Sequence, residues 1–304
     1  MAMHKGPTAA LVSMPSQHRR DTSIALSVDT LVEGTHFFGD VSAESLGHKC
    51  AAVNLSDMAA MGATPAWLCL YVQQPQSDST WLDNFTRGAK GLTTQCNARL
   101  DIRTEYGSQL RISGQVGGYV PSAHAITRDG ARPGDQIIVT GTLGDAGGAL
   151  KLRYDDKYLA KHLDHIALNA RLERPQPRNQ FAIAIRDNVS AGLDLSDGLA
   201  GDLQHILGTT LGAKINAAAL PTSAALARVY PNGADRIRLA LTSGDDYELC
   251  LTLAPTAVAR ARAVGAECGL DVTVVGEIVA SPGINVANAP ALQQTLSGYQ
   301  HFNS

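Results

Sequence analysis

The order of apolar and polar positions in the first half of the chain predicts an α+β unit. Apolar residues recur at helical spacing over residues 43–62 and 79–95, and Ser42 is the expected N-cap of the first helix. Short apolar runs predict strands at residues 9–14, 22–28, 67–73, 99–103 and 110–120. Several strands and a pair of helices before the next break indicate helices packed on a sheet.

The second half of the chain alternates between strand and helix patterns, which predicts a two-domain α/β fold for the whole chain. Strands are expected at residues 136–140, 191–195, 213–217, 249–253 and 272–278. Helices are expected at residues 145–152, 157–172, 180–188, 198–208, 223–229 and 255–264, before a loop-rich tail. Residues 129–135 (DGARPGD) read as a turn between the halves, so we place the boundary of two domains, 1–132 and 133–304, beside it.

The composition of the 304-residue chain narrows the possible partners. Its hydrophobic content of 44% supplies enough apolar residues for a core, and its formal net charge of −3 gives no reason to expect nucleic acid or an anionic membrane. The sequence has no apolar run of membrane-spanning length and no signal-peptide pattern. Its five cysteines form no paired motif, so we expect a cytoplasmic protein with reduced thiols.

Three short acidic segments carry the candidate chemistry. Residues 27–38 (SVDTLVEGTHFF) contain Asp29 and His36, and residues 54–57 (NLSD) and 194–198 (DLSDG) repeat the combination of carboxylate and hydroxyl. Carboxylate and hydroxyl oxygens are ligands that Mg²⁺ accepts, and carboxylates that converge repel one another unless cations lie between them. The set therefore fits nucleotide phosphates bridged by Mg²⁺.

Each of these residues also has a plain structural interpretation. A single aspartate such as Asp29 or Asp197 is common as an N-cap or turn residue, and Asp245 with Asp246 can form a simple acidic turn. His36 can be an ordinary core or surface histidine. The motifs GxxxxGK[ST] and GxGxxG are both absent, which excludes a P-loop and a Rossmann dinucleotide site.

A combination of motifs nevertheless makes the chain similar to a known family. The motifs lie at residues 29–37 (DTLVEGTHF), 51–63 (AAVNLSDMAAMGA), 127–145 (TRDGARPGDQIIVTGTLGD), 193–199 (LDLSDGL), 243–249 (SGDDYEL) and 298–302 (GYQHF). With them the chain resembles the thiamine-monophosphate kinases, within the wider aminoimidazole-ribotide-synthetase-like superfamily. The resemblance implies ATP-dependent phosphorylation of thiamine phosphate to thiamine diphosphate by direct in-line transfer.

The resemblance also implies an architecture. It implies an N-terminal domain over residues 1–132 that holds ATP and metal ions, and whose mixed sheet with helices forms a barrel shared by two protomers. It implies a C-terminal α/β sandwich over residues 133–304, similar to that of aminoimidazole ribotide synthetase. A homodimer is therefore expected, with thiamine phosphate and ATP as ligands and several Mg²⁺ ions between them.

Site roles follow from the resemblance by position. The implied metal ligands are Ser27, Asp29, Asp57, Asp194 and Asp197. Arg128 and Ser196 are expected to contact ATP. His36, Asp245 and Tyr299 are expected to line the thiamine phosphate site. The attacking phosphate oxygen is already anionic near neutral pH, so the reaction needs no strong general base.

Two motifs of the family are changed in this chain. An acidic GDD motif of the family corresponds here to residues 6–8 (GPT), and the family motif GGDTT corresponds to residues 102–106 (IRTEY). Thr104 thus replaces an aspartate, and Ile102 and Arg103 replace two glycines. Three interpretations remain open: an active kinase in which a neighbouring group replaces a lost metal ligand, a homologue that binds ligands without efficient turnover, and a different phosphotransfer or ATP-dependent ligation.

Overall fold

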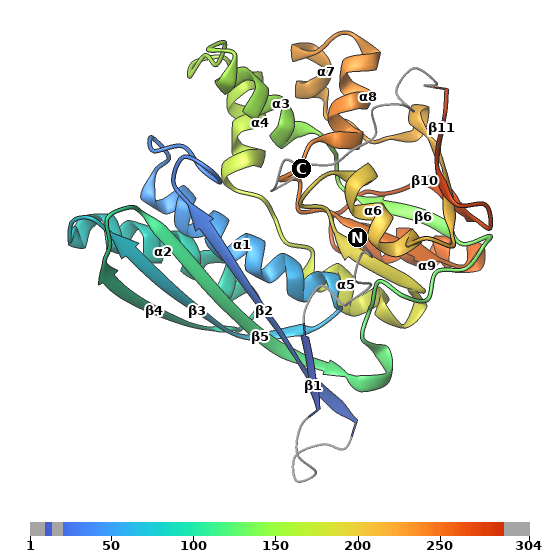
Figure 1. Ribbon diagram of the computed structural model, residues 1–304, viewed down its shortest axis with the longest axis horizontal. Helices are drawn as coiled ribbons and strands as arrows, with labels where there is room; N and C mark the ends of the chain where they lie inside the picture. Colours follow the sequence, from blue (N-terminus) through green and yellow to red (C-terminus); the bar gives the residue numbers. More distant parts are fainter. Residues whose placement is uncertain (1–9, 14–20, 289–304) are drawn as a thin grey trace. The chain divides into compact units, whose positions relative to one another are not determined.

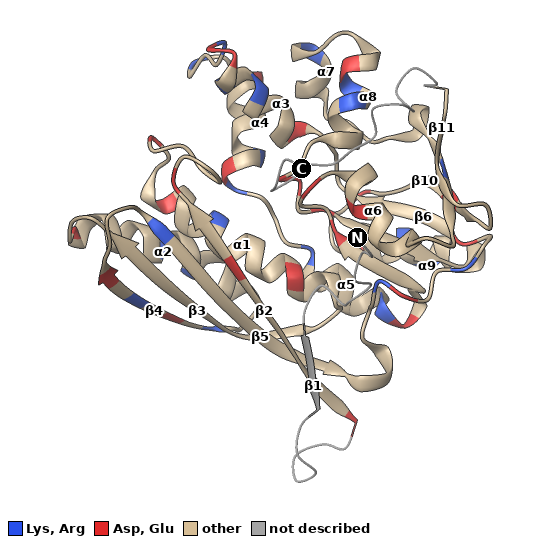
Figure 2. Ribbon diagram, in the orientation of Figure 1, with Lys and Arg blue, Asp and Glu red and all other residues tan. Residues whose placement is uncertain are grey.

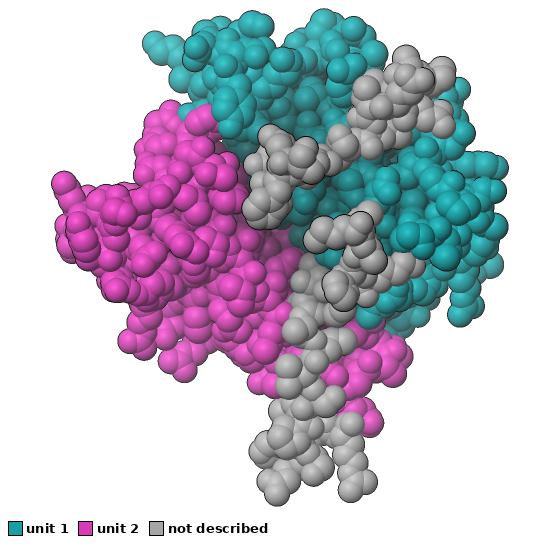
Figure 3. Space-filling model, viewed as in Figure 1, with its two compact units in different colours: residues 1–7, 126–172, 184–304 teal, residues 8–125, 173–183 magenta. Residues whose placement is uncertain are grey.

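The computed structural model describes residues 21–288 and the backbone of residues 10–13, and these form two compact units (Figure 3). The N-terminal unit contains the described residues up to 125 together with residues 173–183. The C-terminal unit contains residues 126–172 and 184–288. Nothing in the sequence pattern indicated that residues 173–183 belong to the N-terminal unit. The predicted domain boundary between residues 132 and 133 stays a prediction.

The N-terminal unit is built on a five-stranded sheet with the strand order β1-β2-β5-β3-β4 (Figure 1). Its strands are β1 (Ala10–Ser13), β2 (Thr22–Val32), β3 (Thr64–Gln74), β4 (Arg99–Tyr106) and β5 (Arg111–Pro121). β3 and β4 run parallel, and the other neighbouring strands run antiparallel. The mixed sheet predicted for this part of the chain is confirmed.

Two helices, α1 (Ala43–Ala60) and α2 (Ser79–Gln95), pack on one face of that sheet (Figure 1). Ser42 caps α1 as predicted, because its Oγ accepts a hydrogen bond from the Ser45 N–H at 3.1 Å. On β3, Leu70 faces the helices and is buried, whereas the neighbouring Tyr71 is 39% exposed. The sheet therefore has one packed face and one face that carries exposed side chains. A single 3₁₀ turn, η1 (Ser122–His124), follows β5.

The C-terminal unit contains a six-stranded mixed sheet with the order β11-β8-β10-β6-β9-β7. Its strands are β6 (Gln136–Thr140), β7 (Ala191–Asp194), β8 (Gly212–Asn216), β9 (Leu249–Leu253), β10 (Val272–Val279) and β11 (Gly283–Ala287). The residues of β9 are all buried, as expected for a central strand covered on both faces.

Helices surround this second sheet (Figure 1). They are α3 (Asp145–Tyr154), α4 (Leu163–Glu173), α6 (Leu199–Leu207), α7 (Ala224–Val229), α8 (Gly233–Thr242) and α9 (Val258–Glu267), with 3₁₀ turns η2 (Arg186–Asn188), η3 (Ala217–Ala219) and η4 (Pro255–Ala257). A further helix, α5 (Asn179–Ile185), falls mostly within residues 173–183 of the N-terminal unit. On one side of the sheet, Leu203 and Ile206 of α6 pack in a core with Ile137 of β6 and Leu193 of β7. Within the described part of the chain, no helix combines the length and the apolar character needed to cross a membrane. The cytoplasmic location stays a prediction.

Three elements differ from the sequence-based predictions. The tail expected to be loop-rich contains β11, which pairs parallel with β8 but buries only Val286 and so leaves a weak apolar pattern. α8 was not predicted, although Asn232 caps its start with a side-chain hydrogen bond to the Ala234 N–H at 3.0 Å. The helix expected from residue 157 begins only at Leu163, because residues 157–162 form turns and exposed loop.

Candidate functional site

The first acidic group lies where β2 faces α1. Ser27 and Asp29 are on the helix-facing side of β2, whereas Val28 between them is 70% exposed on the other side. The Ser27 Oγ donates a hydrogen bond to the Asp57 Oδ2 at 2.5 Å. The Asp29 Oδ1 accepts one from the Thr30 N–H at 2.8 Å. Three of the predicted metal ligands thus lie on the same side of this sheet, within the N-terminal unit.

His36 lies in the turn after β2, and a backbone hydrogen bond selects its tautomer. The Val32 N–H donates to the His36 Nδ1 at 3.1 Å, so this nitrogen carries no proton and the ring proton is on Nε2. The Lys49 Nζ donates to the His36 carbonyl oxygen at 3.3 Å and helps to fix the turn. A neutral imidazole with an Nε2–H donor suits a contact with a phosphate oxygen.

The second acidic group is formed by two loops of the C-terminal unit that lie side by side. Residues 194–198 (DLSDG) begin at the last residue of β7, and residues 243–248 (SGDDYE) precede β9. The Asp245 N–H donates to the Ser196 carbonyl oxygen at 2.9 Å, which continues the antiparallel pairing of the two strands. The loops thereby bring together four residues with predicted roles: Asp194, Ser196, Asp197 and Asp245.

The close approach of these loops requires a glycine and strained backbone. A Cβ on Gly244 would lie 2.2 Å from the Ser196 carbonyl oxygen, which no side chain tolerates. Asp245 has a φ of 67° and Tyr247 a φ of 50°, in the left-handed region that is unfavourable for residues other than glycine. Such strain persists only where the surroundings enforce it, and it concentrates at functional sites. The conformation therefore favours a functional role for Asp245 over a simple acidic turn.

The buried carboxylate of Asp202 in α6 holds the first loop, and sequence reasoning missed it. Its Oδ2 accepts a hydrogen bond from the Asp197 N–H at 2.9 Å. Burial, with a smaller contribution from the charges of Asp197 and Asp194, raises the pKa of Asp202 to about 8 against the opposing effect of backbone hydrogen bonds. Carboxylates crowded in this way are stabilised by a bound proton or a cation. The only signal in the sequence is an aspartate in the first turn of a helix.

Asp246 and Glu248 hold the second loop in the same manner. The Asp246 carboxylate accepts hydrogen bonds from the Gly144 N–H at 2.9 and 3.1 Å, and burial raises its pKa well above the usual range. Glu248 is fully buried and accepts from the Thr140 Oγ1 at 2.7 Å and from the Arg171 guanidinium at 2.6 Å. The motif SGDDYEL contains both carboxylates, but its pattern does not show that they point inward.

Arg128, expected at the ATP site, carries a buried polar atom without a partner. Its Nε makes no hydrogen bond to any described residue, and neither does the Nδ1 of His205 in α6. Burial lowers the pKa of His205, as does the charge of Arg128, whereas Asp197 raises it. Buried polar atoms are nearly always paired in proteins. A phosphate oxygen beside Arg128 would supply the missing acceptor.

The described residues contain no group of three or more His, Cys, Asp or Glu side chains placed to hold a metal ion by themselves. Tyr299 lies outside the described residues. Mg²⁺ in nucleotide enzymes takes one or two carboxylates and completes its shell with phosphate oxygens and water. The oxygen donors of Ser27 with Asp57, and of Asp194 with Asp197, fit that ligand chemistry.

Residues 102–106 (IRTEY), where the resemblance predicts a changed family motif, lie on β4. Pairing across the sheet sets Asp29, Gly114, Leu70 and Ile102 in one row, so Ile102 faces the helices as Asp29 does. The neighbouring Arg103 and Glu105 alternate to the opposite face. Neither of their charged groups lies on the side of the sheet that carries Asp29, so the structure does not favour either of them as a replacement metal ligand.

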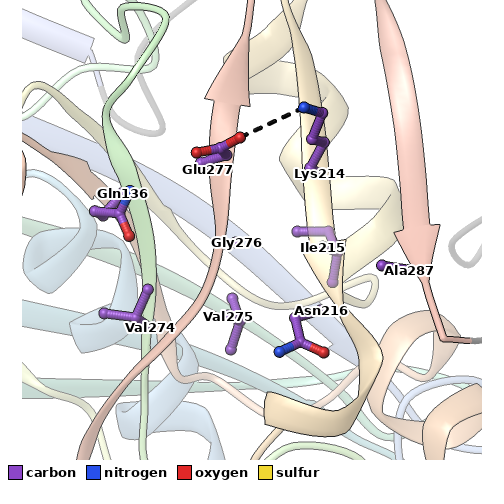
Figure 4. A pocket seen from close by; sticks show the side chains of 9 residues that line it. All are labelled: Gln136, Lys214, Ile215, Asn216, Val274, Val275, Gly276, Glu277 and Ala287. Atoms are coloured by element: carbon purple, nitrogen blue, oxygen red, sulfur yellow. Dashed lines mark ion pairs between the residues drawn. The ribbon is translucent and has the colours of Figure 1, made fainter.

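A groove of about 280 Å³ occurs elsewhere in the C-terminal unit, over β6, β8, β10 and β11 (Figure 4). Across it the Lys214 Nζ lies 3.6 Å from the Glu277 Oε1. Its lining consists of Gln136, Lys214, Ile215, Asn216, Val274, Val275, Gly276, Glu277 and Ala287. None of the predicted site residues is among them, so this groove is separate from the acidic loops.

Comparison with known proteins covers both units. The family model for the N-terminal domain of AIR synthase related proteins matches residues 6–101, and the model for their C-terminal domain matches residues 132–287. A thiamine-monophosphate kinase of Salmonella typhimurium is 37% identical over 98% of this chain and 91% of its own length. One of Escherichia coli K12 is also 37% identical, with the same coverage.

Solved structures give the same relationship. A thiamine-monophosphate kinase from Stenotrophomonas maltophilia K279a superposes with a TM-score of 0.85 at 36% identity, covering 90% of this chain and 88% of that one. The structure of AaThiL complexed with AMPPCP and TMP superposes with a TM-score of 0.83 at 27% identity, covering 97% of this chain and 91% of that one.

Proposed function

Because the chain belongs to the thiamine-monophosphate kinase family, we propose that it transfers the γ-phosphoryl group of ATP to thiamine phosphate and forms thiamine diphosphate and ADP. The observation that carries this proposal is the 37% identity to a thiamine-monophosphate kinase over 98% of the chain. The solved structure of AaThiL with AMPPCP and TMP supports a nucleotide and TMP as the two ligands. The acidic loops and the partnerless Nε of Arg128 are consistent with a site for phosphates.

The reaction requires two polyanions to be held in line. An anionic oxygen of thiamine phosphate forms a bond to the γ-phosphorus of ATP while the bond from that phosphorus to the oxygen of ADP breaks. No proton has to be removed from the nucleophile, so the residues position the groups and screen their charge. We assign His36, through its Nε2–H, and Asp245 to thiamine phosphate, and Arg128 and Ser196 to the nucleotide.

We infer that Mg²⁺ serves the reaction. Ser27, Asp29 and Asp57 would supply its oxygen ligands in the N-terminal unit, and Asp194 and Asp197 would do so in the C-terminal unit. When bound, Mg²⁺ neutralises the phosphates and orients them for transfer. The crowding that raises the pKa of Asp202, chiefly through burial and then through Asp197 and Asp194, supports a cation near that loop.

The proposal is tested by measuring ADP and thiamine diphosphate together. Purified protein should release ADP only when ATP, Mg²⁺ and thiamine phosphate are all present, with thiamine diphosphate formed in equal amount. Thiamine is the matched control, because it lacks the phosphate oxygen that attacks. Equal ADP release with thiamine, or without any acceptor, would contradict the proposal.

A homologue that binds ligands without efficient turnover is the second candidate, and β4 supplies the observation that favours it. By the resemblance, Ile102 and Thr104 correspond to a glycine and an aspartate of the family, and Ile102 lies in the same row of the sheet as Asp29. Calorimetry would then show ATP binding without turnover. If the protein is such a binding homologue, restoring the motif with Ile102→Gly, Arg103→Gly and Thr104→Asp should raise turnover. An unchanged rate would count against this second candidate.

We further propose that the protein forms a homodimer through the open face of the N-terminal sheet. Val28, Tyr71 and Tyr119 are 70%, 39% and 41% exposed there. The rings of Trp67 and Tyr119 meet edge to face, with centroids 6.1 Å apart. Exposed apolar side chains gathered on one sheet face are typical of an interface. Light scattering should give a particle of twice the mass of the chain. The substitution Tyr71→Arg should lower this measured mass.

A further inference from the structure

Two buried polar atoms lie near the loop of residues 194–198 and do not bond to each other. The Arg128 Nε and the His205 Nδ1 are both buried, and neither makes a hydrogen bond with any described residue. Burial lowers the pKa of His205, and so does the charge of Arg128, which places the two side chains near each other. A buried polar atom without a partner costs free energy, so both atoms are expected to meet a third group.

The fold of the C-terminal unit brings both side chains to this loop. Arg128 follows Thr127, whose carbonyl oxygen accepts a hydrogen bond from the Gly192 N–H of β7 at 2.9 Å. His205 lies on α6 three residues after Asp202, and residues at this spacing share one face of a helix. The Asp202 carboxylate accepts a backbone N–H of the loop at 2.9 Å, so this face of α6 is turned toward the loop. Strand and helix thus approach the loop from two sides.

The positive charge of Arg128 also has no counter-ion among the described residues. Acidic residues gather on the loops beside α6 (Figure 2), yet no described carboxylate forms an ion pair with the half-buried Arg128. A water molecule between Arg128 and His205 would satisfy their hydrogen bonds but would not neutralise the guanidinium. A phosphate group does both, because it is an anion with several acceptor oxygens.

We propose that His205 binds a phosphate group of ATP together with Arg128, with one hydrogen bond donated by the His205 Nδ1 and one by the Arg128 Nε. The inference rests on the proposed use of ATP and adds a binding residue to that site. His205 is the residue that the sequence motifs did not indicate, since it lies beyond DLSDGL on α6.

A neutral imidazole suits this position. Burial and the charge of Arg128 lower the pKa of His205 from its ordinary value of 6.5, whereas Asp197 opposes the shift. A neutral ring with its proton on Nδ1 supplies one donor and places no second positive charge beside the guanidinium. The ring therefore adds a directed hydrogen bond to a phosphate whose charge Arg128 neutralises.

Calorimetric titration of the full chain in the presence of Mg²⁺ tests the contact. His205→Leu should raise the dissociation constant of ATP about tenfold, because a hydrogen bond to a charged group is lost. The dissociation constant of thiamine phosphate should stay within about twofold of the wild type, because His205 contacts only the nucleotide. A substitution that merely disturbed the paired loops would weaken both ligands alike.

Two amide variants show which ring nitrogen matters. The side-chain amide of asparagine lies near the position of Nδ1, whereas that of glutamine lies near the position of Nε2. His205→Asn should keep the ATP dissociation constant within about threefold of the wild type, and His205→Gln should weaken binding as His205→Leu does. His162→Leu is the matched control, because His162 is an exposed histidine of the same unit.

The proton on Nδ1 has its own test in the wild-type chain. Nuclear magnetic resonance of ¹⁵N-labelled protein identifies the His205 signals by their absence from His205→Asn. In the complex with ATP and Mg²⁺, the Nδ1 signal should be that of a protonated nitrogen. A His205 Nδ1 without a proton in that complex would overturn its assignment as the donor.

The outcomes separate this contact from the proposed kinase activity. Equal ATP dissociation constants for His205→Leu and His162→Leu would overturn the contact, and so would a loss confined to thiamine phosphate. ATP binding that depends on His205, without formation of thiamine diphosphate, would support the contact and contradict the kinase activity. A wild-type chain that binds no ATP would overturn both.

Discussion

The two units hold their acidic residues in different ways. In the N-terminal unit, the Ser27 hydroxyl and the Asp57 carboxylate meet directly between a strand and a helix, and both residues are half-buried. In the C-terminal unit, Asp202, Asp246 and Glu248 are at most 5% exposed and bind backbone and side-chain donors behind the loops. One unit presents its carboxylates on regular elements, and the other supports its loops with a second set of carboxylates.

The difference separates two kinds of substitution. Loss of a carboxylate between β2 and α1 should affect phosphoryl transfer and leave the fold intact, since the helix and sheet are held by apolar packing. Loss of a buried carboxylate or its partner behind the loops should first affect stability, because it leaves an unpaired charge or donor in the interior.

Removing the buried ion pair beneath the second loop should lower the stability of the protein more than any other change considered below. Arg171→Ala leaves the fully buried Glu248 without its cation and should lower the free energy of unfolding by about 3 kcal/mol. Urea denaturation measures the change. Arg260→Ala is the control, because its ion pair with Glu267 is exposed and should contribute less than about 1 kcal/mol. Equal losses of unfolding free energy in the two variants would contradict the view that the pair of Arg171 and Glu248 supports the second loop.

Neutralising the carboxylate of the N-terminal unit should act on catalysis. Asp57→Asn keeps an acceptor for the Ser27 hydroxyl but removes the charge, so kcat/KM should fall about 100-fold, equivalent to about 2.7 kcal/mol. The melting temperature should stay within a few degrees of the wild type. Asp101→Asn on the exposed edge strand serves as the control and should keep full activity. A large loss of stability in Asp57→Asn would contradict the expected difference between the units, because Asp57 would then support the fold as the buried carboxylates of the C-terminal unit do.

The close contact of the two loops should be sensitive to a single methyl group. Gly244→Ala places a Cβ against the Ser196 carbonyl oxygen and should cost about 2 kcal/mol of stability through displacement of the loops. Gly233→Ala at the start of α8 is the matched control, because a Cβ there has no neighbour closer than 3.8 Å. Thermal unfolding of both variants distinguishes a packing effect from a general effect of alanine.

Buried ionisable groups should give the two units opposite responses to pH. Burial raises the pKa of Asp246 above its usual value, so the folded state holds a proton that the unfolded chain has lost. Its contribution to stability is therefore lost as pH rises, at a rate of up to about 1.4 kcal/mol per pH unit. Stability curves of wild type and Asp246→Asn should diverge with increasing pH. Parallel curves would mean that Asp246 is ionised in the folded protein.

His48 of the N-terminal unit predicts a smaller effect in the other direction. Its Nε2 lies 2.8 Å from the Pro175 carbonyl oxygen, and burial lowers its pKa, with the Pro175 hydrogen bond opposing and Arg174 adding to the shift. As pH falls, the unfolded chain therefore binds this proton at a higher pH than the folded protein does. Stability is then lost below the ordinary histidine pKa of 6.5, by about 1 kcal/mol per pH unit. His48→Gln should flatten the acid side of the stability curve, and an unchanged curve would contradict the assignment.

The regular spacing of apolar residues along the chain made much of the fold predictable. The helix predicted at residues 79–95 is found as α2 with those ends, and the strands predicted at residues 136–140 and 249–253 are found as β6 and β9. β11 and α8 were not predicted from the sequence. β11 buries a single residue, and α8 is a short helix next to a Pro- and Gly-containing turn. The place of residues 173–183 in the N-terminal unit depends on contacts that no local pattern encodes.

The site was predictable only in part. The resemblance identified Asp194, Asp197 and Asp245, and the structure gathers them at two paired loops. It gave a role to Asp245 and none to Asp246, but the sequence pattern did not show that Asp246 is buried, because their different environments depend on left-handed backbone at residue 245 and on the distant Gly144 N–H. Sequence spacing alone likewise gave no sign that Ser27 reaches Asp57.

One measurement tests the proposed activity most directly: ³¹P nuclear magnetic resonance of purified protein with ATP, Mg²⁺ and thiamine phosphate. We expect the thiamine phosphate signal to be replaced by the two signals of thiamine diphosphate, while ATP is converted to ADP in equal amount. A spectrum in which ATP and thiamine phosphate persist unchanged, although calorimetry shows that both bind, would contradict the kinase assignment and favour the binding homologue.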